Sequence, residues 1–177
     1  MFRWSVLTAA AGAATITVSA AQAVPTRVTV RLLSKDAKFV GTTMGGARIT
    51  IRDADTGEML AHGVTQGSTG DTQRIMRDDW KRGAALSTEG SARFDAVLDL
   101  DEPRRIEIAA FGPLAQLQSA GAASVTQWVV PGKHLDQGDG VLLVVPGFSV
   151  DVMSPPVHSR LRGTPQRVTI RANLVML

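Results

Sequence analysis

The sequence contains no cysteine and no tyrosine, and only 5% of its 177 residues are aromatic. Without cysteine the chain forms no disulfide, thiolate nucleophile, iron–sulfur cluster or cysteine zinc site. A net charge of +3 with few aromatics does not favour a nucleic-acid partner, which needs dense basic patches and stacking rings. Hydrophobic residues make up 44% of the chain, so it has enough apolar material to bury a core.

Charge is also missing near the N-terminus, where no charged residue lies between Arg3 and Arg27. Residues 6–18 are apolar and small, and Ala21-Gln22-Ala23 has the small side chains that signal peptidase accepts. An uncleaved anchor needs ~20 apolar residues, and this run is interrupted by threonine, serine and glutamine. We therefore expect a signal peptide at 1–23, a mature chain from Val24 with no membrane span, and a periplasmic or secreted location.

Alternation with a period of two residues dominates the rest of the sequence. Residues 27–32 place Val28, Val30 and Leu32 on one face and arginine and threonine on the other, as in a half-buried strand. The same pattern at 48–52 and 167–171 predicts three strands with one face in water. Further strands are predicted at 59–65, 92–100, 105–111, 124–130, 141–145 and 148–153, the last two as buried strands.

Turn residues separate these segments, and helix is scarce. The Asp53–Glu58 segment predicts a hairpin turn, and prolines at 131 and 146 end the strands before them. Only 72–82 and 113–119 have a helical pattern, the first with Asp71 or Thr72 as its cap. The expected fold is an all-β antiparallel sandwich, Ig-like or prealbumin-like, with a short helical insertion and spanning residues 24–177.

Several segments resemble one known family. They are 46–53 (GARITIRD), 55–58 (DTGE), 63–65 (GVT), 90–94 (GSARF) and 105–112 (RIEIAAFG). Together they are similar to the carboxypeptidase regulatory-like domains, which are prealbumin (transthyretin)-like seven-stranded sandwiches, over about residues 28–112. Residues 124–177 then supply additional strands. The resemblance implies a non-catalytic, often extracytoplasmic module used for support or binding, with no catalytic residues to transfer.

The most polar loop of the second half is the candidate binding site. Residues 131–140 contain His134, Asp136 and Asp139 among glycines, and Trp128 lies just before them. Loops at the ends of a sandwich often carry binding sites. The two aspartates could supply oxygen ligands to Ca²⁺, although the full EF-hand pattern is absent, and a solvated hairpin turn is the alternative.

No catalytic motif stands out. The sequence has no Gly-x-Ser-x-Gly elbow and no His-Glu-x-x-His, and its three histidines have no metal-ligand spacing. We expect no cofactor and a non-catalytic protein that acts in binding or structural support in the cell envelope. A periplasmic carrier of copper, calcium or a small ligand is the alternative, because methionine and histidine suit copper. A hydrolase is the third possibility.

Two apolar segments bear on partners, for which the candidates are an envelope protein, a small ligand or a second copy of the chain. Residues 108–132 contain no charge, which indicates either core strands or a neutral surface for a partner. The final segment 168–177 alternates and ends in apolar residues. We expect it to pair within the sandwich, and an exposed edge there would instead favour a homo-oligomer.

Overall fold

The computed structural model describes residues 22–163 and 165–176, so that all but the last two residues of the predicted signal peptide lie outside this part. The strands of the sandwich are β1 (Val24–Ser34), β2 (Arg48–Asp53), β3 (Met59–Val64), β4 (Phe94–Leu100), β5 (Arg104–Gly112), β6 (Gly121–Val129) and β7 (Val141–Val145). A separate hairpin contains β8 (Phe148–Ser154) and β9 (Arg171–Met176). The short helical elements are η1 (Thr42–Met44), α1 (Thr72–Met76) and η2 (Leu117–Ser119).

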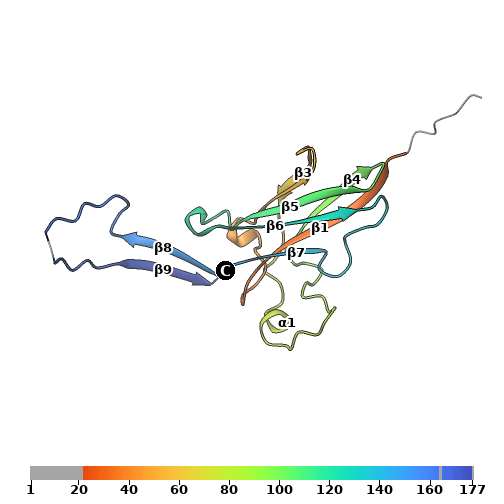
Figure 1. Ribbon diagram of the computed structural model, residues 1–177. Coiled ribbons are helices and arrows are strands. Elements are labelled where there is room, and N and C mark those ends of the chain that lie inside the picture. The colour runs from red at the N-terminus through yellow and green to blue at the C-terminus, as the bar shows by residue number, and fades with distance from the viewer. Residues whose placement is uncertain (1–21, 164, 177) are drawn as a thin grey trace, which may run out of the picture.

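Two sheets form the sandwich, with strand orders β4-β1-β7 and β3-β2-β5-β6 (Figure 1). The all-β sandwich expected from the alternation is thus confirmed. One pairing differs from the expected antiparallel pattern. Residues 24–30 of β1 pair antiparallel with β4, whereas residues 30–34 pair parallel with β7. Because β1 is long enough to pair with two strands in succession, it joins β4 to β7, the last strand of the sandwich.

The core lies between the two sheets and is built from the inward residues of the alternating strands. Val28 and Val30 of β1 face Ile49 of β2 and Ile108 of β5, and all four are fully buried. Each such side chain contributes roughly 1.5–3 kcal/mol by leaving water. A second, smaller cluster around Phe39 packs beneath α1. Burial therefore holds the sandwich without any disulfide.

The predicted helix at 72–82 is shorter than expected. Asp71 caps α1, since its carboxylate accepts a hydrogen bond from the Arg74 amide at 2.8 Å, as the sequence predicted. The helix ends at Met76 because Arg77 leaves the helical region, and the Trp80 indole N–H donates to the Ile75 carbonyl. The chain thus folds back over its own helix instead of extending it.

Most of the polar face of β1 is not in water, which corrects the prediction for residues 27–32, although Arg27 at its start stays exposed. Arg31 is only 4% exposed and Thr29 8%. The guanidinium of Arg31 donates to the carbonyls of Ser91 and Ala92 and stacks over the Phe39 ring. The segments before β4 and before β7 cover this face, and strand periodicity contains no information about such loops.

The C-terminal strands also differ from the prediction. β8 and β9 pair only with each other, in a hairpin that projects from the sandwich (Figure 1). The expected buried strand at 148–153 is exposed, and the last strand does not lie within the sandwich. Of the strand predicted at 167–171, only Arg171 belongs to β9, and no pairing between described residues includes 167–170.

Candidate binding groove on the four-stranded sheet

The outer face of the β3-β2-β5-β6 sheet brings polar and small side chains into register. Alternation points the apolar residues of β2 and β5 into the core and leaves their other residues outward. Two adjacent rows cross all four strands: Val64, Arg48, Phe111, Ala122, and then His62, Thr50, Ala109, Ser124. These rows form the middle of a continuous surface assembled from strands far apart in sequence.

A shallow groove of about 740 Å³ follows this surface. Thr50, Ala109 and Ser124 are neighbours in the register and are short, so they form its floor. Taller side chains border the floor at both ends, with Arg48 and Phe111 at one end and Arg52, Glu107 and Met59 at the other. The groove exists because small residues occupy the outward positions at the centre of the sheet.

The charged groups of the groove are two arginines and one glutamate. The guanidinium of Arg48 lies over the Phe111 ring, 5.2 Å from its centroid, a cation–π geometry. Arg52 donates to the Gly57 carbonyl at 3.2 Å. Within the described residues, neither arginine forms an ion pair with Glu107 or with any other acid. The groove therefore presents cationic groups beside a floor of small side chains.

The predicted site residues of the 131–140 loop are bonded to the protein itself. Asp139 accepts the backbone N–H groups of Leu86 and Ser87 at 2.9 and 2.8 Å. The Nδ1 atom of His134 accepts the Arg27 N–H at 3.1 Å. The loop also adds an isolated parallel bridge to β1 through Leu135. It thus lies along the same edge of β1 that β7 occupies further on.

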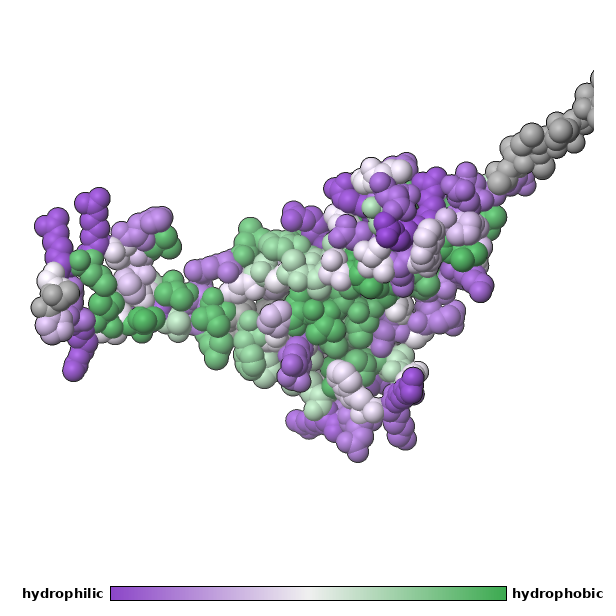
Figure 2. All heavy atoms as spheres, in the orientation of Figure 1, coloured by the Kyte–Doolittle hydropathy of each residue, from purple (hydrophilic) through white to green (hydrophobic). Residues whose placement is uncertain are grey.

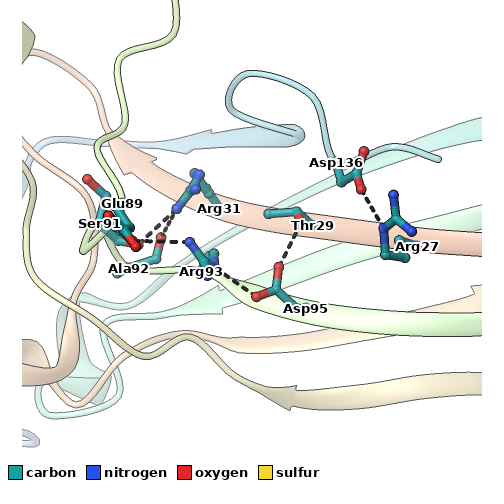
Figure 3. A network of polar contacts seen from close by, with 9 residues as sticks. All are labelled: Arg27, Thr29, Arg31, Glu89, Ser91, Ala92, Arg93, Asp95 and Asp136. Atoms are coloured by element: carbon teal, nitrogen blue, oxygen red, sulfur yellow. Dashed lines mark hydrogen bonds and ion pairs between the residues drawn. The ribbon is translucent and has the colours of Figure 1, made fainter.

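Asp136 belongs to a row of polar contacts along β1 (Figure 3). It forms an ion pair with Arg27 at 2.7 Å, and this hydrogen bond holds the pKa of Asp136 below its usual range. Further along the row, Asp95 accepts from Thr29 and Arg93, both at 2.7 Å. Burial alone would raise the pKa of Asp95, but these hydrogen bonds and the nearby arginines lower it overall. The row fastens β1 to β4 and to the loop.

The structure brings two of the four predicted site residues together and leaves the other two apart. His134 and Asp136 both accept hydrogen bonds from Arg27, one from its backbone N–H and one from its side chain. Asp139 instead contacts the 86–87 segment, and Trp128 lies on the outer face of β6, 65% exposed, opposite Arg105. Among residues 22–163 and 165–176, no group of three His, Asp or Glu side chains is placed to hold a metal ion. The ligand site predicted from the loop stays a prediction for its individual residues.

Sequence reasoning did not single out the groove. The sequence nonetheless contains an indication of the groove. Residues 48–52 and 105–111 alternate, and their outward positions carry Thr50 and Ala109, where strands usually carry larger residues. The uncharged segment 108–132 supplies residues both to the core between the sheets and to the surface of the groove. The sequence does not show that β2 and β5 are neighbours in the sheet.

No protein-family model matches the sequence, and comparison with curated proteins and with solved structures returns no match. The similarity to carboxypeptidase regulatory-like domains therefore stays a prediction. In the described part of the chain, no helix has the length and apolarity needed to cross a bilayer.

Proposed function

We propose that this protein is an exported, non-catalytic β-sandwich of the periplasm or cell envelope that binds a ligand on the outer face of its four-stranded sheet. The observation that carries the proposal is the groove itself, with its floor of Thr50, Ala109 and Ser124 between cationic and aromatic borders. Small side chains at the centre of an exposed sheet leave room that a bound molecule can fill.

The chemistry of the groove favours an extended ligand with an apolar body and an acidic group. The apolar part fits the Phe111 ring and the alanines that line the groove, and the acidic group fits Arg48 and Arg52. Guanidinium groups bind carboxylates in a planar, bidentate geometry. Glu107 at the same end as Arg52 repels a second acidic group, so a single acid is preferred.

Binding rather than turnover is supported by how the titratable groups are used. The carboxylates of Asp136 and Asp139 accept hydrogen bonds from the protein's own side chains and backbone, so they are already engaged within the fold. In the groove, His62 is the one imidazole, and no hydrogen bond between described residues links it to a hydroxyl or carboxylate. A nucleophile with an adjacent base is the arrangement that a hydrolase needs.

The test is an amide NMR titration of the chain from Val24 with laurate, kept below its micelle concentration. The expected result is saturable shifts of amides in 48–52, 109–111 and 122–124. Ala109→Trp places a large ring on the groove floor and is expected to weaken laurate binding at least about tenfold. The control Val97→Trp adds the same ring on the outer face of β4, where Val97 is exposed, and leaves binding unchanged. Unchanged binding by Ala109→Trp would refute the groove.

A further inference from the structure

The C-terminal hairpin is an arm with one uncovered apolar face. We define the arm as residues 148–176, with β8, β9 and the loop between them. Its register pairs Phe148 with Met176, Val150 with Leu174, and Val152 with Ala172, so all six lie on one face. Phe148 is 52% exposed and Leu174 62%. A two-stranded hairpin with a bare apolar face is at best marginally stable in water, so this face is built to be covered.

The loop at the tip of the arm combines exposed apolar and basic side chains. Val157 is 80% exposed and Ile170 70%, and Leu161 is also exposed. Three arginines, at 160, 162 and 167, are interleaved with these residues. Figure 2 shows apolar side chains along the arm and long hydrophilic side chains projecting from its tip.

Charge is distributed unevenly between the arm and the sandwich. The sequence has no acidic residue after Asp151, and residues 148–177 carry four arginines against that single aspartate, a net charge of +3. Residues 24–147 contain 14 basic and 15 acidic residues, a net charge of −1. No ion pair between described residues engages an arginine of the arm. The arm thus presents uncompensated positive charge next to apolar side chains.

We propose that the arm docks on an anionic lipid surface. Stable attachment to a bilayer takes two signals, an apolar group that enters the interface and basic residues that meet the anionic headgroups. The arm supplies both within one element. It also extends clear of the sandwich, so its tip can reach a flat surface without obstruction by the rest of the molecule (Figure 1). The arm is separate from the groove, so an experiment can contradict lipid docking without contradicting ligand binding in the groove, and the reverse.

A second copy of the chain is the main competing occupant of the apolar face. Two arms packed face to face would each carry a net charge of +3, and like charges brought close together repel one another. A lipid surface instead offers the opposite charge over its whole area. Charge complementarity therefore favours lipid over arm-to-arm dimerisation.

The test uses the chain from Val24, because the apolar leader would itself bind lipid. Since the sequence has no cysteine, Leu161→Cys gives a single site for an environment-sensitive fluorophore. Vesicles of phosphatidylcholine with about one-third phosphatidylglycerol are expected to shift the emission to the blue, and pure phosphatidylcholine vesicles are not. The shift is expected to reverse in about 1 M NaCl, where the Debye length is about 3 Å. The same label on Val97→Cys, on β4, stays unshifted.

Matched charge variants, measured by vesicle sedimentation, separate the arm from overall charge. Replacing Arg160, Arg162 and Arg167 by glutamine is expected to weaken binding to the anionic vesicles on the order of 100-fold, from about fivefold per arginine. Replacing the exposed residues Arg77, Lys81 and Arg82 by glutamine removes the same charge from the sandwich and is expected to change binding less than about threefold.

Three outcomes would overturn the proposal: no binding to anionic vesicles, equal binding to neutral ones, or equal loss in both triple variants. A blue-shifted Leu161→Cys label without vesicles, together with a dimeric mass in sedimentation, would also overturn it and would assign the arm to a second copy. Far-UV circular dichroism checks that each variant keeps the β fold, and the exposure of the substituted residues makes that the expected result.

Discussion

At the scale of single residues, Asp139 is a predicted ligand that also has bonds within the protein. The sequence offered it as an oxygen donor for calcium, but both carboxylate oxygens accept backbone N–H groups, from Leu86 and Ser87. Removing them leaves two backbone donors without a partner, and a hydrogen bond to a charged group contributes about 1.5–3 kcal/mol. We expect Asp139→Ala to lower the free energy of unfolding by about 2–3 kcal/mol, measured by urea denaturation.

Asp136→Ala is the control for this prediction. Its partner Arg27 is 56% exposed, and an exposed ion pair contributes little, so its loss should leave the urea midpoint close to that of the unmodified protein. The same experiment tests the carrier alternative. A calcium-dependent rise of the midpoint that Asp139→Ala abolishes would show that Asp139 is a ligand after all.

Asp53, the last residue of β2, makes stability depend on pH. The backbone N–H groups of Thr56 and Asp55 donate to its carboxylate and hold the pKa of Asp53 below its usual range. Because the pKa in the unfolded chain is higher, about 3.9, the ionised form favours folding. This contribution is complete above about pH 4 and is lost as the pH falls through the lower, folded-state pKa.

Asp53→Asn tests this dependence. Asparagine still accepts the two N–H bonds but does not ionise, so the melting temperature of the variant should fall less steeply than that of the unmodified protein between about pH 5 and pH 2. Thermal melts followed by circular dichroism measure it. Asp79→Asn, in the exposed loop after α1, is the control and should keep the full acid dependence. If the melting temperatures of Asp53→Asn and the unmodified protein fell equally at acid pH, Asp53 would not be a source of the pH dependence.

At the scale of elements, the alternating pattern located strands well but not their surroundings. The segments 27–32 and 48–52 have the same Thr/Arg pattern, yet Arg31 is buried by loops whereas Arg48 borders an open groove. A period of two specifies which residues share a face, and that is why β1, β2 and β5 could be predicted. It does not specify which strands are neighbours or which loops fold over them.

In the C-terminal hairpin the error is the reverse: a strand predicted to be buried is exposed. The continuous apolar run at 148–153 is typical of a buried strand, because buried strands need no polar face. A strand that binds another molecule has the same composition, so sequence alone does not distinguish it from a strand buried within the fold. The groove was not predicted for a related reason. Small residues such as Ala109 and Ser124 form a floor only when β5 and β6 lie side by side, and the sequence does not show that pairing.

The arm should be dispensable for the sandwich. β7 completes the three-stranded sheet at Val145, and the arm meets the sandwich mainly near η2, where Ser119 Oγ donates to the Val150 carbonyl at 2.7 Å. We expect a chain ending at Gly147 to melt within a few degrees of the full chain, because little packing is lost. Hydrogen exchange of amides in β1, β2 and β5 should be unchanged, and loss of cooperative melting would contradict the prediction.

At the scale of the whole molecule, two surfaces of different chemistry lie on different elements. The groove on the four-stranded sheet is rigid, because its floor residues sit on strands whose other faces form the core. The basic, apolar arm is attached through a single connection after β7. A rigid binding face joined to a separate lipid-docking arm would hold a ligand close to an envelope surface, which unites the two proposals without making either depend on the other.

Export itself is tested by where the mature chain begins. Cleavage after Ala23 leaves β1 whole, and its first residues are needed: Val24 pairs with Leu100, and the buried Thr26 hydroxyl accepts the Gly132 N–H at 3.0 Å. We expect periplasmic protein from an exporting host to have the intact mass of a chain starting at Val24. Ala23→Arg should block processing because the peptidase requires a small residue there, whereas Gln22→Arg, at the permissive middle position, should not. Equal processing of both variants would place the boundary elsewhere, and unprocessed chain in the periplasm would contradict cleavage itself. Any cut beyond Thr26 would leave the Gly132 N–H without its partner and the sandwich less stable.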